Sequence, residues 1–190
     1  MFFGVYRWNY DNGLALYSQG LFYVFLETGY GIIYTLAIPP KNMSNNKKGR
    51  KMIHNFYDFD DTIGIQDYTY FFATFSMEKS LENSQPLRSL DDMVRQFKKG
   101  EAVFVLTARP FSKSGQRGIQ LFLRRYGIVI PKSSIFMVGG AGEPKAQLIE
   151  KYLPRASKIR FYDDLPENIN AVKEMAIKNN FDKMETYLIK

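Results

Sequence analysis

The stretch HNFYDFDDTI, from His54 to Ile63, decides how this chain folds and which chemistry it can carry. It places three carboxylates and a threonine directly behind a short apolar run, and neither a hydrophobic core nor solubility requires such a cluster. In an extended backbone, Asp58 and Asp60 would point to the same side, but a turn here would separate them and give each its own role. The cluster therefore predicts a phosphoryl-transfer site at the end of a strand.

The length and composition fit one globular domain with a short extension. The chain has 190 residues, of which 45% are hydrophobic and 16% aromatic, whereas disordered segments are poor in such residues. It contains no cysteine, which excludes disulfides and thiolate metal sites. Because that composition fits a reducing compartment, we expect a cytoplasmic protein.

The formal net charge of +7 raises the question of a nucleic-acid partner. Residues 1–51 contribute +4 of that charge, so the remainder of the chain is only mildly basic. Within the remainder, the stretch from Arg95 to Lys132 holds nine basic residues and one acid, Glu101. Two interpretations of this stretch stay open: a solvated helix face, or a docking rim for a phosphate-rich polymer.

Residues 1–51 differ in composition from the rest of the chain. They are rich in aromatic residues and glycine, and between residues 14 and 38 the one charged residue is Glu27. A membrane span needs about 20 mostly apolar residues, so a membrane tether through residues 14–38 is one interpretation. Glu27 and the glycines make this stretch a poor span, and no membrane partner is predicted. The other interpretations are an extension folded onto the domain and a dispensable leader, including an overlong reading frame whose true start is Met43 or Met52.

After Met52, short apolar runs alternate with helical patterns, which is typical of parallel strands joined by crossover helices. We expect strands over residues 53–57, 102–106, 135–138 and 158–162. We expect helices from a cap at Ser89 to a stop at Gly100, over 114–126, from Pro144 onward and over 166–179, with a polar and aromatic segment before Gln85. The domain at 52–190 is therefore predicted to be α/β with a parallel central sheet.

Polar residues follow the carboxyl ends of these strands or open the helices that come next. They are Asp58 and Asp60 after the first strand, Thr107 after the second, Lys145 in the helix after the third, and Asp163 and Asp164 after the fourth. In an open parallel sheet, ligands bind at the edge formed by the carboxyl ends of the strands. We therefore expect these side chains to form one site.

Four motifs, taken in order, resemble those of the haloacid dehalogenase (HAD) superfamily of aspartyl phosphatases. They are DFDDT at 58–62, VLTAR with Thr107, Lys145 at a helix start, and FYDDLPEN with Asp163 and Asp164. The resemblance covers roughly Met52 to Ile189 and implies a three-layer α/β/α Rossmann-like fold. One departure is Asp61, which stands where the family often has glycine or asparagine.

The resemblance implies a phosphohydrolase, here a phosphatase, that depends on Mg²⁺ and forms an aspartyl phosphate. Asp58 would be the nucleophile, and Asp60 would protonate the leaving oxygen and then activate water. Thr107 and Lys145 would position the phosphate electrostatically. The metal ligands implied are Asp58, the backbone carbonyl of Asp60, Asp163 directly, and Asp164 through water. The substrate-binding residues implied are Thr62, Thr107, Ala108, Arg109 and Lys145, with a surface ion pair as the second interpretation of Arg109.

Substrate choice in this family depends largely on cap insertions, and the spacings predict a small flap and no large cap. Thr62 and Thr107 are 45 residues apart, and Thr107 and Lys145 are 38 apart; a flap, two helices and two strands fill these intervals. An open site would admit a bulky phosphate, so a nucleotide or the phosphorylated end of a nucleic acid is the expected substrate, with a sugar phosphate as the alternative. The flap aromatics from Tyr68 to Phe75 either pack within the protein or stack on a base or sugar.

Two other classes of protein share parts of this pattern. One is a catalytically weak binding or scaffold protein on the same fold, which turnover would distinguish. The other is a receiver module phosphorylated on aspartate, which the order disfavours because receivers carry their lysine last, whereas here Asp163 and Asp164 follow Lys145. The sequence does not determine the oligomeric state.

Overall fold

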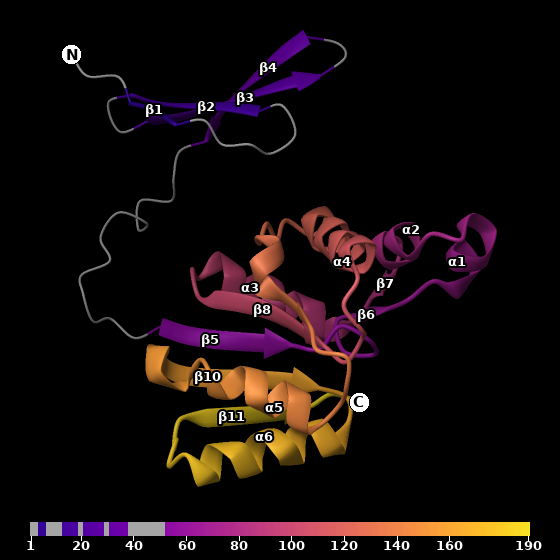
Figure 1. The fold of residues 1–190 in the computed structure, drawn as a ribbon, viewed down its shortest axis with the longest axis vertical. Coiled ribbons are helices and arrows are strands. Elements are labelled where there is room, and N and C mark those ends of the chain that lie inside the picture. The colour runs from indigo at the N-terminus through magenta and orange to yellow at the C-terminus, as the bar shows by residue number, and fades with distance from the viewer. Residues whose placement is uncertain (1–3, 7–12, 19–20, 29–30, 38–51) are drawn as a thin grey trace. The chain divides into compact units, whose positions relative to one another are not determined.

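The computed structural model describes residues 4–6, 13–18, 21–28, 31–37 and 52–190, with side chains from Met52 onward (Figure 1). The chain divides into two compact units, Met1–Arg50 and Lys51–Lys190. The described part of the first unit consists of β-strands, and the second unit carries all of the residues predicted above to form a site.

The first unit contains β1 (Gly4–Tyr6), β2 (Gly13–Ser18), β3 (Leu21–Thr28) and β4 (Gly31–Ala37), which pair antiparallel in that order. The stretch 14–38, considered above as a membrane tether, therefore runs through three strands. Among the described residues there is no helix with the length and apolar character needed to cross a membrane. The proposed start at Met43 lies outside the described residues, and the leader interpretation stays a prediction.

The second unit is built on a five-stranded parallel sheet with the order β11-β10-β5-β8-β9. The strands are β5 (Met52–Tyr57), β8 (Ala102–Thr107), β9 (Ile135–Met137), β10 (Ala156–Asp163) and β11 (Met184–Leu188). The first strand of the unit lies in the middle, between β8 and β10. Its carboxyl end, where the acid cluster begins, is therefore flanked by the carboxyl ends of two other strands.

Helices cover both faces of this sheet, which confirms the predicted three-layer α/β/α Rossmann-like fold (Figure 1). The helices are α3 (Arg88–Lys98) and α4 (Lys113–Arg125) on one face, and α5 (Glu143–Glu150) and α6 (Pro166–Lys178) on the other. Successive side chains of a strand point to opposite faces. Accordingly, Tyr57 belongs to the core cluster that contains Leu90 and Phe122, whereas Phe56 belongs to the cluster that contains Ile149 and Val172.

A small flap lies between β5 and α3. It comprises β6 (Gly64–Ile65), α1 (Tyr68–Thr74), α2 (Met77–Glu82) and β7 (Gln85–Pro86), with β6 and β7 paired antiparallel. From Met52 to Lys190 the remaining inserted elements are two short 3-10 helices, Lys132–Ser134 and Leu153–Arg155, so no large cap is present. The flap packs on the domain through α2, which lies against α4.

Two sequence expectations about the elements differ from the structure. Ser89 does not cap α3: the N-cap is Leu87, and Ser89 lies inside the helix, where its buried hydroxyl donates to the carbonyl of Thr62. Strand β11 was not predicted, and it forms the edge of the sheet beside β10. The signal for it is weak, because its β-formers are two neighbouring residues, Thr186 and Tyr187. Asn180, with a positive φ of 51°, turns the chain out of α6 before this strand.

Gly118 lies where α4 packs closely against α2 of the flap. A Cβ at this position would lie 2.5 Å from the carbonyl oxygen of Glu78 and 2.9 Å from Cβ of Leu81, both in α2. Because that backbone cannot move without shifting the flap, Gly118→Ala is expected to destabilise the protein by about 2 kcal/mol in urea unfolding, despite the better helix propensity of alanine. Gly115→Ala in the same helix is the control, since its Cβ meets a flexible methyl group, Cε of Met137, at 3.1 Å. Equal stability of the two variants would contradict this packing.

Candidate active site

The carboxyl edge of the sheet brings together residues that are far apart in the sequence. Asp58 directly follows β5, Thr107 is the last residue of β8, and Asp163 is the last residue of β10. The backbone amide of Asp58 donates to the carbonyl of Tyr162 at 2.9 Å, which fixes the end of β5 against β10. Each of these positions is one that the sequence motifs had selected.

Lys145 is the centre of the site. It lies in the first turn of α5, and its ammonium donates to Oδ1 of Asp58 at 2.8 Å and to Oδ2 of Asp163 at 2.7 Å. The lysine is 1% exposed, and the side chains of Asp58 and Asp163 are 6% and 0% exposed. Because an unpaired buried charge is very costly, this lysine is stable here only as the partner of the two carboxylates.

Asn168, in α6, orients this pair and was missed as a functional residue. Its amide nitrogen donates to Oδ1 of Asp163 at 2.7 Å, and its amide oxygen accepts from the backbone amide of Gly142, just before α5. The backbone amide of Leu165 also donates to Oδ1 of Asp163, at 3.0 Å. The sequence signal was the asparagine within FYDDLPEN, which becomes meaningful only when α5 and α6 are placed side by side.

Three acids form a group that could hold a metal ion. Asp58, Asp163 and Asp164 each offer a carboxylate oxygen, and these oxygens lie within 4.8 Å of one another. An all-oxygen, carboxylate-rich set fits a hard divalent cation such as Mg²⁺. The carboxylate of Asp60 is not part of this group, and the role expected for its backbone carbonyl stays a prediction.

Burial raises the pKa of Asp58 to about 7. The Lys145 ammonium opposes this rise, whereas the nearby Asp163 carboxylate adds to it. The pKa of Asp164 is also raised, chiefly by burial and then by Asp163 and Asp61. A divalent cation between these carboxylates would favour their ionised forms, so cation binding and deprotonation are expected to be coupled.

Asp60 has a different environment from Asp58. Its side chain is 36% exposed, and Arg109 binds it through two nitrogens, with the Nε contact to Oδ2 at 2.8 Å. Thr107 Oγ1 donates to the same Oδ2 at 3.3 Å. Of the two interpretations of Arg109, the structure shows an ion pair, with Asp60 as the partner; contact with a substrate phosphate stays a prediction.

Arg109 also connects the site to the flap. Its guanidinium donates to the amide oxygen of Gln66, and the amide nitrogen of Gln66 donates to Ser80 of α2 at 2.9 Å. Gln66 is buried and had no assigned role in the sequence analysis. The flap therefore sets the position of Arg109, and through it the position of Asp60.

The loop that follows Asp58 contains Asp61 and Thr62. Asp61 has a positive φ of 54° and its amide donates to Gly64 at 3.1 Å, a conformation that glycine, asparagine and aspartate adopt most readily. Thr62, predicted to bind substrate, is fully buried, and its hydroxyl has no partner among the described residues. Ala108, also predicted to bind substrate, is partly exposed beside Thr107.

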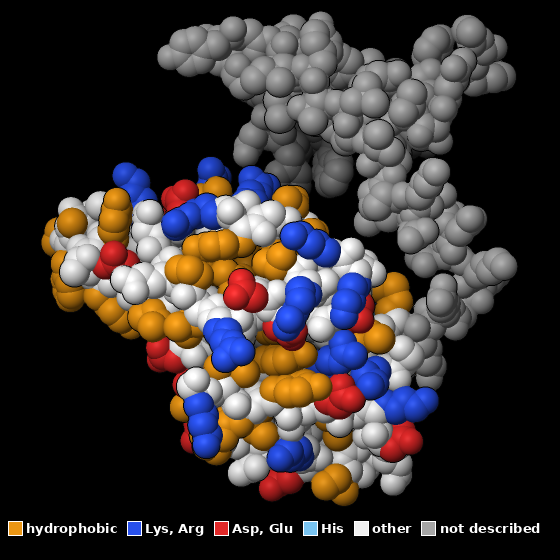
Figure 2. All heavy atoms as spheres, turned by 180° about the vertical axis from the view of Figure 1, so that it is seen from behind, with side chains coloured by type: hydrophobic (Ala, Val, Ile, Leu, Met, Phe, Trp, Pro, Cys, Tyr) orange, Lys and Arg blue, Asp and Glu red, His pale blue; other side chains and the backbone are white. Residues whose placement is uncertain are grey.

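Of the basic residues in the stretch 95–132, Arg109 lies at this edge, bound to Asp60. Arg95 pairs with Asp92, Arg117 with Glu78, and Arg125 donates to the carbonyl of Glu82. On the face shown in Figure 2, Lys and Arg side chains lie among acidic and hydrophobic ones. In contrast, aromatic side chains of the flap are well exposed: Tyr68 is 60%, Phe72 67% and Phe75 83% exposed.

Comparison with known proteins adds no family to this description. No family model matches the chain, and no curated protein matches it at a significant level. The fold class is established by the structure, and membership of the haloacid dehalogenase superfamily stays a prediction from the motifs.

The raised pKa of Asp58 predicts a pH dependence of stability in the absence of divalent cations. Since the folded-state pKa lies above the unfolded value of 3.8, the native state binds more protons between these values and loses stability as the pH rises through them. Relative to Asp58→Asn, the wild type should therefore lose about 2 to 3 kcal/mol of unfolding free energy between pH 5 and pH 8, measured with urea in a chelator. Asp91→Asn, at an exposed acid on α3, should leave the slope unchanged. Parallel curves for wild type and Asp58→Asn would contradict the burial of this charge.

Proposed function

We propose that this protein is a magnesium-dependent phosphatase of the haloacid dehalogenase type, which hydrolyses a phosphomonoester through an aspartyl phosphate. The observation that carries the proposal is the buried Lys145 ammonium between Asp58 and Asp163, beside an oxygen cluster that fits a divalent cation. This constellation lies at the carboxyl edge of a parallel sheet, where open α/β proteins bind ligands.

In the first step, a carboxylate oxygen of Asp58 would attack phosphorus. Lys145 holds Oδ1, so Oδ2 is the oxygen left to form the new O–P bond. The bond from phosphorus to the leaving oxygen breaks, and Asp60 would give that oxygen a proton. Mg²⁺, when bound, would offset the negative charge that the phosphoryl group shares with the carboxylates.

In the second step, water would attack the phosphorus of the aspartyl phosphate while Asp60 takes its proton. The O–P bond to Asp58 breaks, phosphate leaves, and both acids return to their starting states. Arg109 and Thr107, which bind Asp60 from two sides, would hold it at the distance that both proton transfers need. Thr107 and Lys145 would also meet the phosphoryl oxygens.

We infer that the substrate is a nucleotide or the phosphorylated end of a nucleic acid. The site has a small flap and no large cap to close over it, and the flap carries exposed aromatic side chains, Tyr68 among them. Such side chains stack on bases without regard to sequence. The absence of cysteine supports a reducing compartment such as the cytoplasm for this activity.

A catalytically weak binding protein on the same fold is the second proposal. It is favoured by the double contact of Arg109 with Asp60, because the guanidinium already occupies both oxygens of that carboxylate. In the active phosphatase, the arriving substrate phosphate would have to share Arg109 with Asp60. Turnover decides between these proposals.

Release of phosphate from an aryl phosphate is the direct test. The wild type should turn over with Mg²⁺ and stop in a chelator, and Asp58→Asn should lower kcat at least a thousandfold because no O–P bond can form. Asp91→Asn removes the same charge at an exposed position and should retain activity. Activity that survives Asp58→Asn would refute the nucleophile; the absence of activity in the wild type on a broad substrate panel would favour the binding protein.

A panel of nucleotides, sugar phosphates and 3′-phosphorylated oligonucleotides would test the substrate class. If the flap stacks on the leaving nucleoside, Tyr68→Ala should lower kcat/KM for nucleotides about tenfold and leave that for sugar phosphates within twofold. Ile177→Ala, at a 76% exposed apolar position on α6, is the matched control. An equal loss on both substrate types would show that Tyr68 supports the flap rather than the base.

A further inference from the structure

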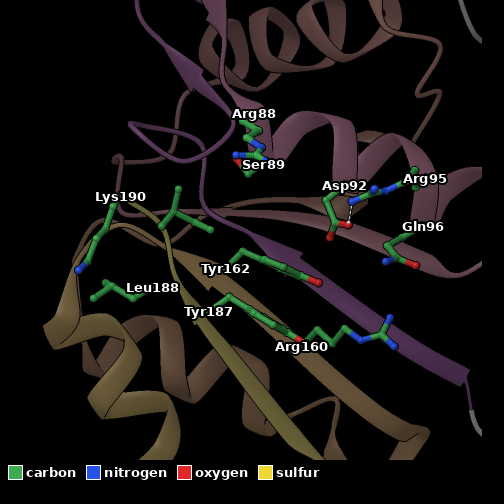
Figure 3. Close-up of a pocket in the computed structure, with 11 residues that line it drawn as sticks. Arg88, Ser89, Asp92, Arg95, Gln96, Arg160, Tyr162, Tyr187, Leu188 and Lys190 are labelled. Carbon is green, nitrogen blue, oxygen red and sulfur yellow. Dashed lines mark hydrogen bonds and ion pairs between the residues drawn. The ribbon is translucent and has the colours of Figure 1, made fainter.

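A groove of about 540 Å³ lies between α3 and the strands β10 and β11 (Figure 3). Its volume is in the range of small-molecule sites. The α3 residues that line it recur at the spacing of one helix face, and Arg160, Tyr162 and Tyr187 come from one face of the sheet. The α3 residues are Arg88, Ser89, Asp92, Arg95 and Gln96; the others are Arg160, Tyr162, Tyr187, Leu188, Ile189 and Lys190.

The floor of the groove is rigid. The rings of Tyr57, Tyr162 and Tyr187 stack across three strands, with ring centroids 4.3 and 4.5 Å apart and interplanar angles of 6° and 9°. Arg160 lies beside them and is fixed by ion pairs to Glu101 at 2.9 Å and to Glu185 at 3.0 Å. These contacts organise the groove before any ligand arrives.

Two polar groups of the groove lack partners. Gln96 is 8% exposed, and its Oε1 is buried without a hydrogen bond among the described residues. An unpaired buried acceptor of this kind is unfavourable, and a ligand donor would satisfy it once the Gln96 amide turns toward the groove. Arg88, at the other end of the same helix face, is exposed and forms no ion pair in the described part of the chain. The acid between them, Asp92, is already bound by Arg95 at 2.6 Å and by the hydroxyl of Tyr57 at 3.2 Å.

We propose that this groove binds a nucleoside phosphate, with the phosphate at Arg88 and Lys190 and the base edge at Gln96. The eight helical steps from Arg88 to Gln96 span about 12 Å along the helix, which matches the reach of a nucleotide from its phosphate to the far edge of its base. Arginine and lysine are the usual phosphate partners, and a glutamine amide bonds the paired donor and acceptor of adenine. The tyrosine hydroxyls between the two ends offer polar contacts for the sugar.

The groove is a separate surface from the catalytic edge but adjoins its backbone. Ser89 donates to the carbonyl of Thr62 in the loop after Asp58, and the amide of Ile189 donates to the carbonyl of Asp163 at 2.9 Å. A ligand in the groove would therefore contact elements that hold two catalytic loops in place. The proposal does not depend on phosphatase activity, because binding is measured without turnover.

Equilibrium dialysis of AMP against the full chain in a chelator tests this site. The chelator prevents turnover and removes any cation that could bridge a phosphate to the acid cluster. Arg88→Ala and Gln96→Leu should each weaken AMP binding about tenfold, whereas Arg124→Ala, an exposed arginine on α4, should leave it unchanged. Thermal unfolding of each variant checks that it folds, and Arg88 is exposed enough that its removal should not disturb the core.

Ligand fragments assign the two ends of the groove. Ribose 5-phosphate should respond to Arg88→Ala and not to Gln96→Leu, and adenosine should show the reverse. AMP binding that neither variant changes, or no AMP binding at millimolar concentration, would overturn the site. Ribose 5-phosphate that binds as tightly as AMP would overturn the nucleoside assignment.

Discussion

The ion pair between the buried Lys145 ammonium and the carboxylates of Asp58 and Asp163 is the interaction on which the rest of the site depends. It joins α5 to the ends of β5 and β10, three elements separated by up to 105 residues in the sequence. Removal of one partner from such a buried pair typically costs about 3 to 5 kcal/mol. The sheet order makes the pair geometrically possible, because β5 and β10 are neighbours and their ends coincide.

The charges around Lys145 do not cancel within the protein. One ammonium faces Asp58, Asp163 and Asp164, so full ionisation leaves two negative charges in excess. The protein on its own reduces that excess by a raised pKa at Asp58 and Asp164, and a divalent cation carries the charge that would remove it. The same electrostatic imbalance therefore accounts for the pKa shifts and for the preference of the cluster for a cation.

The elements with strong apolar patterns were predictable, and contacts between distant elements were not. The sequence analysis identified β5, β8, β9 and β10, because each is a short apolar run. Three of them lead into the motifs with Asp58, Thr107 and Asp163, and β9 precedes Lys145. The prediction that Ser89 is the N-cap of α3 was wrong. A serine before a helical pattern usually caps the helix, whereas here its hydroxyl donates to the carbonyl of Thr62, in the loop after Asp58. The partnership of Arg109 with Asp60 and that of Asn168 with Asp163 depend on side chains that meet only in the folded sheet.

The two acids two residues apart, Asp58 and Asp60, lie in different environments. The chain turns after Asp58, with Asp61 at positive φ, so Asp58 points into the Lys145 cluster while Asp60 meets Thr107 and Arg109 at a partly exposed position. In the proposed reaction, the leaving group must lie on the side of Asp60, since that residue protonates it. Arg109 links Asp60 to Gln66 of the flap, so a shift of the flap would move the acid and not the nucleophile. Substrate fit at the flap would thereby act on the proton-transfer step, and the attacking carboxylate would stay fixed by its lysine.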